Sequence, residues 1–196
     1  ELALLKSQVN PHFLFNSLNS IYYLAIKKAD EAPKAIIALS DMMRYVLTEA
    51  SDDAVRLEKE VDYIQKYINL QKLRIPKHTL VNTEIDIRDE DLEIAPLLLI
   101  PFIENAFKYG SDEIAISSFY NRHEKRVYCK VRDFGPGIPH EELAGVFMPF
   151  AQGDKARNSS GSGLGLAIIR RIIEAHDGEV TLRNHPQQGL VAEFYL

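Results

Sequence analysis

Three short motifs in the second half of the chain carry residue types that bind nucleotides and metal ions. In chain order they occupy residues 104–109, 133–138 and 161–166. The first motif places an amide, Asn105, three positions before a cation, Lys108, so the two side chains share one face of a helix. An amide oxygen is a ligand that Mg²⁺ accepts beside phosphate oxygens. This pair is therefore a candidate for holding a metal ion and an anion together.

The other two motifs combine a carboxylate with closely spaced glycines. Asp133 ends an alternating, strand-like run just before a Gly-Pro-Gly turn, where it can accept a hydrogen bond from the amino group of a base. Residues 161–166, Gly-Ser-Gly-Leu-Gly-Leu, open a helix, and glycines there let backbone N–H groups approach an anion. Each motif alone is also compatible with an ordinary turn or a solvated side chain. The sequence has no Gly-x-x-x-x-Gly-Lys-Ser/Thr, which excludes a P-loop site.

A fourth unusual segment, Asn-Pro-His-Phe-Leu-Phe-Asn, occupies residues 10–16. Pro11 within a helical pattern removes one backbone hydrogen bond and crowds the carbonyl of Ser7, at a cost of about 3 kcal/mol. A distortion of that size beside His12 indicates function, although a lone helical histidine is usually structural. Neutral imidazole is a nucleophile near neutral pH, so His12 is a candidate acceptor in group transfer.

Helical elements must position this histidine. Residues 1–29, 33–50 and 57–74 carry apolar side chains at helical intervals, with a turn near Asp30 and a break at residues 51–53. Long helices joined by a short turn form an antiparallel hairpin. Its apolar stripe has no cover within the segment, so we expect a second copy to complete a dimeric four-helix bundle.

From residue 76 onward the pattern changes to alternating strands and helices. Strands are expected at residues 81–87, 113–120, 126–132, 179–183 and 190–195. Buried or amphipathic helices are expected at residues 96–109 and 163–175. A mixed sheet backed by helices, an α/β sandwich, follows from this order. We therefore divide the chain into a dimerisation and phosphoacceptor domain, residues 1–75, and a nucleotide-binding domain, residues 76–196.

Composition narrows the classes of partner. The chain has 23 basic and 28 acidic residues, and no basic stripe that would neutralise nucleic-acid phosphates. The single cysteine, Cys129, lies in a strand-like run and is expected to be buried in a reducing, cytoplasmic compartment. No apolar run approaches the roughly 18 residues of a membrane span. Because the sequence opens within a helical pattern, an upstream sensor or membrane segment is expected in the parent protein.

Together, the three glycine and asparagine motifs resemble the N, G1 and G2 boxes of the GHKL ATPases, which include histidine kinases, gyrase, the Hsp90 chaperones and MutL. The resemblance covers about residues 80–196 and implies the Bergerat fold with ATP held between the boxes. It implies that Asn105 coordinates Mg²⁺, that Lys108 contacts phosphate and that Tyr109 lies near the nucleotide. It also assigns Asp133 to the adenine amino group. It further implies that Gly135 and Gly137 shape the adenine pocket.

The same resemblance implies an ATP lid. Two aromatic residues, Phe147 and Phe150, resemble an F box that packs against it. Two cations within it, Lys155 and Arg157, are candidates for the γ-phosphate, with ordinary solvated charges as the alternative. The resemblance implies that Gly161, Gly163 and Gly165 form the hinge of the lid and cradle phosphates, and that Leu164 also contributes to nucleotide binding.

Hydrolytic members of the superfamily carry a glutamate four residues before the metal-binding asparagine, as general base for water. Pro101 occupies that position here and cannot act as a base. Glu104 lies about 100° away around the helix and is poorly placed for the role. We therefore expect ATP to be held without rapid hydrolysis, which requires an acceptor other than water.

Residues 10–16 resemble the phosphoacceptor motif of LytS/YehU-type histidine kinases, and residues 70–74 and 96–106 resemble the same subfamily. The resemblance implies a homodimer in which Mg-ATP phosphorylates His12 and the phosphoryl group passes to an aspartate of a response regulator receiver domain. Phe13 stands where orthodox kinases carry an acidic base, so no base is assigned. Asn16, at i+4 from His12, is a candidate for orienting the water that dephosphorylates the regulator, or a tolerated polar residue.

Residues 147–180 resemble the orthodox EnvZ-type kinases instead, with a longer lid than is usual in the LytS type. A natural mosaic and an engineered chimera both account for this combination. Two further readings stay open: an ATPase or clamp that uses ATP to drive conformational change, and a nucleotide-binding signalling scaffold. The proline at position 101 and the histidine motif argue against the first, and the intact boxes argue against the second.

Overall fold

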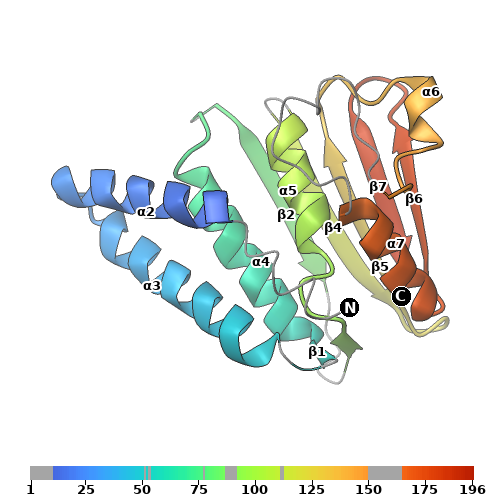
Figure 1. Cartoon of the computed structure of the whole chain (residues 1–196), viewed down its shortest axis with the longest axis horizontal. Helices are drawn as coiled ribbons and strands as arrows, with labels where there is room; N and C mark the ends of the chain where they lie inside the picture. Colours follow the sequence, from blue (N-terminus) through green and yellow to red (C-terminus); the bar gives the residue numbers. More distant parts are fainter. Residues whose placement is uncertain are drawn as a thin grey trace. The chain divides into compact units, whose positions relative to one another are not determined.

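The computed structural model describes residues 11–50, 52, 54–76, 78–86, 92–110, 113–149 and 165–196. The chain divides into two compact units (Figure 1). The helical unit comprises Glu1–Lys77 together with Glu90–Leu97. The second unit comprises His78–Asp89 together with Leu98–Leu196, and we call it the nucleotide-binding unit after the function predicted for it. The chain therefore crosses between the units three times, and the last crossing follows Leu97.

The helical unit contains α2 (Pro11–Ile26), α3 (Glu31–Arg44), a π-helix η1 (Tyr45–Glu49) and α4 (Leu57–Lys72). The predicted helices are confirmed within the described residues. The buried positions of α3 recur at helical spacing, at Ala32, Ala35, Leu39 and Met42. Aromatic side chains join the helices, because Phe13 of α2 stacks on Tyr67 of α4 with ring centroids 4.6 Å apart.

A two-stranded antiparallel ladder in the helical unit was not predicted. It pairs β1 (Val55–Arg56) with β3 (Glu93–Ile94), and the N–H of Leu57 extends it by donating to the carbonyl of Leu92 at 2.7 Å. Two-residue strands are too short to show an alternating pattern in sequence. The ladder holds the segment around β3 against the start of α4.

The nucleotide-binding unit is built on a five-stranded sheet in the order β2-β4-β5-β7-β6. Its strands are β2 (Leu80–Asp86), β4 (Glu113–Asn121), β5 (Arg126–Asp133), β6 (Glu179–Asn184) and β7 (Leu190–Tyr195). Strands β2 and β4 are parallel, and the other neighbours are antiparallel. All five predicted strands are confirmed.

Two helices cover one face of this sheet, α5 (Ile100–Tyr109) and α7 (Gly165–Ala175), as Figure 1 shows. A short helix, α6 (His140–Leu143), lies between β5 and α7 in the sequence. Alternate residues of β5 are buried, including Cys129, and burial raises the pKa of that thiol to about 12. Phe102 of α5 stacks on Phe194 of β7 with ring centroids 5.0 Å apart, which anchors the helix to the sheet. A helical region followed by an α/β sandwich is thus the fold predicted from the sequence.

One element boundary differs from the prediction. The helix expected from Pro96 begins at Ile100, because Leu97 adopts a left-handed backbone conformation with φ 61°. Residues 96–99 form turns and bends that precede the helix. No helix in the described part of the chain is both long enough and apolar enough to cross a membrane.

Candidate functional site

The alternation of β5 places Asp133 on the buried face of the sheet at the end of the strand. Its side chain is buried, with 7% of its surface exposed. Oδ1 accepts hydrogen bonds from the backbone N–H groups of Gly135, at 2.9 Å, and Leu190, at 3.2 Å. Burial raises the pKa of Asp133, and these two hydrogen bonds oppose the rise. Both bonds from described residues end on Oδ1, which leaves Oδ2 able to accept from a ligand.

Glycines surround Asp133 because the backbones approach too closely for side chains. A Cβ on Gly135 would lie 2.3 Å from the carbonyl oxygen of Tyr109. A Cβ on Gly189 would lie 1.8 Å from the carbonyl oxygen of Asp133, and Gly189 has a positive φ of 91°. The end of α5, the turn after β5 and the start of β7 therefore meet at backbone contact, which fixes the carboxylate in place.

The hairpin between β6 and β7 clamps the turn after β5. The N–H of Ile138 donates to Oδ1 of Asn184 at 2.9 Å, and Nδ2 of Asn184 donates to the carbonyl of Ile138 at 2.7 Å. Gln188 donates through Nε2 to the carbonyl of Phe134 at 2.8 Å. Gly137, with φ 72°, leaves room for the Asn184 side chain, because a Cβ there would lie 2.6 Å from Oδ1.

Sequence reasoning missed Asn184, Gln188 and Gly189 as parts of this site. Each acts through contacts with residues about 50 positions earlier, which no local motif reveals. The single available signal was the glycine that ends Asn-His-Pro-Gln-Gln-Gly between two strands.

The helix α5 carries the residues of the first motif. Its buried side, including Phe102, Ile103 and Ala106, packs into the unit, whereas Asn105 is partly exposed and Lys108 is exposed. Nζ of Lys108 lies 5.0 Å from the ring centroid of Tyr109. The amide and the cation thus lie one helical turn apart on the less buried side of α5.

Glu104 has the most perturbed carboxyl of this region. Burial raises its pKa to about 7, and the nearby charge of Lys108 opposes the rise. The Glu104 carboxyl therefore gains or loses its proton near neutral pH. It directly precedes Asn105 on the helix. Pro101, in the first turn of α5, is buried.

The structure describes part of the predicted lid region. Phe147 lies near α7, with the guanidinium carbon of Arg170 5.5 Å from its ring centroid. Gly165 begins α7, and a Cβ there would meet nothing within 4 Å. The remaining residues of the predicted lid lie outside the described residues: Phe150, Lys155, Arg157, Gly161, Gly163 and Leu164.

The amide oxygen of Asn105 suits Mg²⁺ only if phosphate oxygens complete the shell of ligands. Within the described ranges no group of three or more histidine, cysteine, aspartate or glutamate side chains could hold a metal ion. Mg²⁺ commonly keeps few protein ligands and completes its shell with phosphate oxygens and water. A single amide on α5 fits that pattern, and the glycine-lined approach to Asp133 fits a planar base.

In the helical unit, both His12 and Asn16 lie within α2. The side chain of His12 lies outside the described residues, and Asn16 is partly exposed. One face of α2 packs inward through Phe13, Ser17 and Ile21. Large apolar side chains recur every three or four residues along its other face and remain exposed: Phe15, Leu18, Tyr22 and Ile26.

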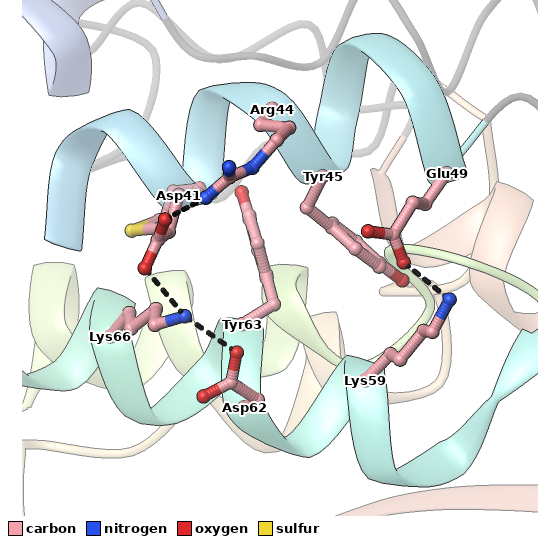
Figure 2. Close-up of a pocket in the computed structure, with 9 residues that line it drawn as sticks. Asp41, Arg44, Tyr45, Glu49, Lys59, Asp62, Tyr63 and Lys66 are labelled. Carbon is pink, nitrogen blue, oxygen red and sulfur yellow. Dashed lines mark hydrogen bonds and ion pairs between the residues drawn. The ribbon is translucent and has the colours of Figure 1, made fainter. Parts of the chain in front are cut away.

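The helical unit also contains a small cavity of about 170 Å³ beside α3, η1 and α4 (Figure 2). Its charged side chains already pair with one another. Lys66 contacts Asp41 at 3.1 Å and Asp62 at 2.7 Å, and Lys59 contacts Glu49 at 2.8 Å. None of the predicted site residues lines it, so the cavity is an ion-paired seam between helices.

Comparison with known proteins gives a match for each unit. The family described as "Histidine kinase" matches residues 1–79, and the family described as "Histidine kinase-, DNA gyrase B-, and HSP90-like ATPase" matches residues 90–196. The second match covers more than half of the chain.

Individual relatives agree with both families. Sensor protein LytS of Oceanobacillus iheyensis is 36% identical over 201 aligned positions, covering 98% of this chain and 33% of the relative. Sensor protein LytS of Bacillus subtilis is 33% identical over 147 residues, covering 73% of this chain and 25% of the relative. The catalytic domain of histidine kinase ThkA superposes with a TM-score of 0.52 at 25% identity, covering 73% of this chain and 95% of that one. The chain thus spans a quarter to a third of the length of these LytS relatives.

Proposed function

This chain belongs to the histidine kinase-, DNA gyrase B- and HSP90-like ATPase family, and we propose that it is a kinase core that phosphorylates its own His12 from Mg-ATP. The match of residues 1–79 to the histidine kinase family favours phosphoryl transfer over a mechanical ATPase cycle. The identification as a histidine kinase, made from the sequence motifs, is confirmed by these matches.

The observation that carries the proposal is the enclosure of Asp133. A buried carboxylate with one oxygen held by two backbone N–H groups presents its other oxygen in a fixed direction. Such a group accepts a hydrogen bond from the exocyclic amino group of adenine and repels the carbonyl of guanine. We assign Asp133 to nucleotide selection, with Gly135 and Gly137 leaving room for the base.

Asn105 and Lys108 would act on the phosphate side of the site. When bound, ATP would supply the phosphoryl group and Mg²⁺ would neutralise charge. The chain's own contribution is positioning, because α5 holds an amide and an ammonium one turn apart on a helix anchored by buried side chains. Positioning and charge stabilisation account for most of catalysis in phosphoryl transfer.

The first turn of α5 supports an acceptor other than water. Pro101 is buried in the first helical turn and has no group that could activate water. We therefore assign the phosphoryl group to His12 of α2, and its onward transfer to a receiver domain of a response regulator.

A homodimer is the proposed assembly, through the exposed apolar side chains of α2. Four large side chains at helical spacing form a continuous stripe that a monomer would leave in water. Ile36, Ile37 and Leu47, in α3 and η1, are also exposed. Pairing with a second copy would bury these residues in a bundle.

Incubation with γ-labelled ATP tests the proposal. We expect acid-labile, base-stable label on the unmodified protein, and none on His12→Gln. Affinity for ATP should stay within about threefold, because His12 belongs to the helical unit and the nucleotide motifs do not. Label on His12→Gln at the level of the unmodified protein would refute the assignment.

A further inference from the structure

The described part of the chain buries two acidic side chains, and only Asp133 belongs to the nucleotide site. The other is Glu60 of α4, which has 0% of its surface exposed. Burying a carboxylate is costly unless hydrogen bonds compensate, and an apolar side chain of similar size would fill the same space without that cost. A buried glutamate outside the proposed chemistry therefore requires its own explanation.

Glu60 joins two segments that are far apart in the sequence. Its Oε2 accepts a hydrogen bond from the hydroxyl of Tyr45, in η1, at 2.7 Å. The same oxygen accepts from the backbone N–H of Leu97 at 3.0 Å. Burial and the charge of Glu60 raise the pKa of Tyr45, so its hydroxyl keeps its proton and remains a donor. Figure 2 shows Tyr45 pointing from η1 into the seam beside α4.

Leu97 occupies a special place in the chain. It is the last residue of the helical unit before the chain enters the nucleotide-binding unit, and its φ of 61° is strained for leucine. Three residues later α5 begins, and α5 carries Asn105 and Lys108. The ladder between β1 and β3 holds the preceding residues, and Leu97 is itself buried. The hydrogen bond to Glu60 is therefore the last attachment described before the crossing.

We propose that Glu60 is a positioning residue that anchors the segment leading into α5 to the helical unit. The anchor fixes where and in which direction the chain leaves that unit, and so shortens the free link between α2 and the nucleotide site. A shorter link that still spans the two sites raises the effective concentration of one reacting group at the other. This inference rests on the proposed function, in which His12 and ATP belong to different units.

Three variants separate an anchor from a contact that only stabilises the fold. Glu60→Leu combined with Tyr45→Phe removes the acceptor of the Leu97 N–H together with the Tyr45 hydroxyl, which would otherwise lose its acceptor. Glu60→Gln retains an oxygen that can accept the Leu97 N–H. Glu58→Gln is the matched control, because Glu58 lies in the first turn of the same helix and is exposed.

Hydrogen exchange and kinetics give two readouts. In the double variant, we expect the amide of Leu97 to exchange at least about tenfold faster, since its buried acceptor is lost. At saturating Mg-ATP the rate of autophosphorylation should fall by about tenfold, with affinity for nucleotide within about twofold. In the single variant Glu60→Gln, the exchange rate of the Leu97 amide and the rate of autophosphorylation should both stay within about threefold of the unmodified protein. Glu58→Gln should leave both rates unchanged.

Unchanged exchange at Leu97 in the double variant overturns the proposal, as does an unchanged rate or an equal loss of nucleotide affinity. If the double variant does not fold, the unmodified protein decides: a Leu97 amide that exchanges as fast as an open turn contradicts the anchor. If the unmodified protein acquires no label from ATP, the proposed function fails, while the exchange measurement still tests the attachment of Leu97 to Glu60.

Discussion

Asn16 of the helical unit and Asp133 of the nucleotide-binding unit lie in different environments. In the helical unit, His12 and Asn16 lie on a regular helix whose neighbouring Phe15, Leu18 and Tyr22 are exposed. In the nucleotide-binding unit, Asp133 is buried at a strand end, where glycine-only backbone contacts and the β6–β7 hairpin enclose it. The exposed side chains of α2 leave an apolar surface available to another molecule. The contacts around Asp133 hold its carboxylate in one position.

This difference matches what each residue is proposed to do. A helix that is proposed to pair with a second copy needs an exposed apolar face for that pairing. A group that selects a base gains most from a fixed direction and a dry environment. Substitutions that act on one unit and spare the other test whether the two sites differ in this way.

The largest effect is expected at the open surface of α2. Leu18→Glu combined with Tyr22→Glu places two charges in the exposed apolar stripe. If the stripe is buried between copies, the dimer should weaken by about 3–6 kcal/mol, the value of two large apolar side chains. Light scattering at micromolar concentration should show a dimer for the unmodified protein and a monomer for the variant, with nucleotide affinity unchanged. A monomeric unmodified protein would overturn the bundle.

Next in size is a change at the enclosed site. In Gly189→Ala, the new methyl group would meet the carbonyl oxygen of Asp133 at 1.8 Å, at a residue with positive φ. The resulting shift of the pocket should weaken ATP binding by roughly 100-fold, measured by calorimetry. Gly145→Ala is the control, because its methyl group would lie at an ordinary 3.6 Å from the carbonyl of Glu142. Equal affinities for the two variants would show that this crowding does not shape the pocket.

A smaller change tests the chemistry of the same pocket without altering its shape. Asp133→Asn removes the charge from the acceptor of the adenine amino group, an interaction worth about 1.5–3 kcal/mol. Affinity for ATP should fall accordingly, and GTP should bind poorly to the unmodified protein because it carries a carbonyl at that position. Equal affinities for ATP and GTP in calorimetry would refute this role of Asp133.

Glu104 predicts a pH dependence of the nucleotide-binding unit. Burial raises its pKa from 4.5 to about 7, so the folded protein keeps this proton where the unfolded chain has lost it. Its contribution to the free energy of unfolding is therefore complete below about pH 4.5 and is lost as the pH rises through about 7. Between pH 5 and pH 8, Glu104→Gln should gain on the order of 2 kcal/mol relative to the unmodified protein in denaturant unfolding. A difference that does not change with pH would contradict the raised pKa.

The smallest expected effect concerns Asn16. If its amide orients water for dephosphorylation of the regulator, Asn16→Ala should slow that reaction by about threefold to tenfold. Autophosphorylation of His12 should be retained. The assay mixes purified phosphorylated regulator with either protein and ADP and follows the loss of phosphate over time. Equal rates would leave Asn16 a structural residue of α2.

The sequence predicted most of the fold because its signals are local. Alternating residues gave all five strands of the sheet, and helical spacing gave α3, α4 and α7. The start of α5 was wrong by four residues, because no local pattern indicates the positive φ of Leu97, whose N–H donates to Glu60, 37 positions earlier. The β1–β3 ladder was missed because two residues show no period.

The positions of three candidate site residues were predictable from local motifs. Asp133 ends a strand, and Asn105 and Lys108 lie one turn apart on a helix. Their roles in binding stay predictions. The clamp by Asn184 and Gln188 was not predictable, because side-chain amides that bond to distant backbone leave no pattern in the local sequence. Glu60 was hidden for the same reason, as its position in α4 reads as one more polar residue of a helix.

The most direct test of the central claim follows the γ-phosphate of ATP to its destination. The unmodified protein is incubated with Mg-ATP, digested under alkaline conditions and analysed by mass spectrometry, while inorganic phosphate is measured in parallel. Transfer to His12 requires phosphohistidine in the peptide containing that residue, with little phosphate released to water. Phosphate on another residue, or ATP consumed with all of its γ-phosphate released to water and none on His12, would contradict it.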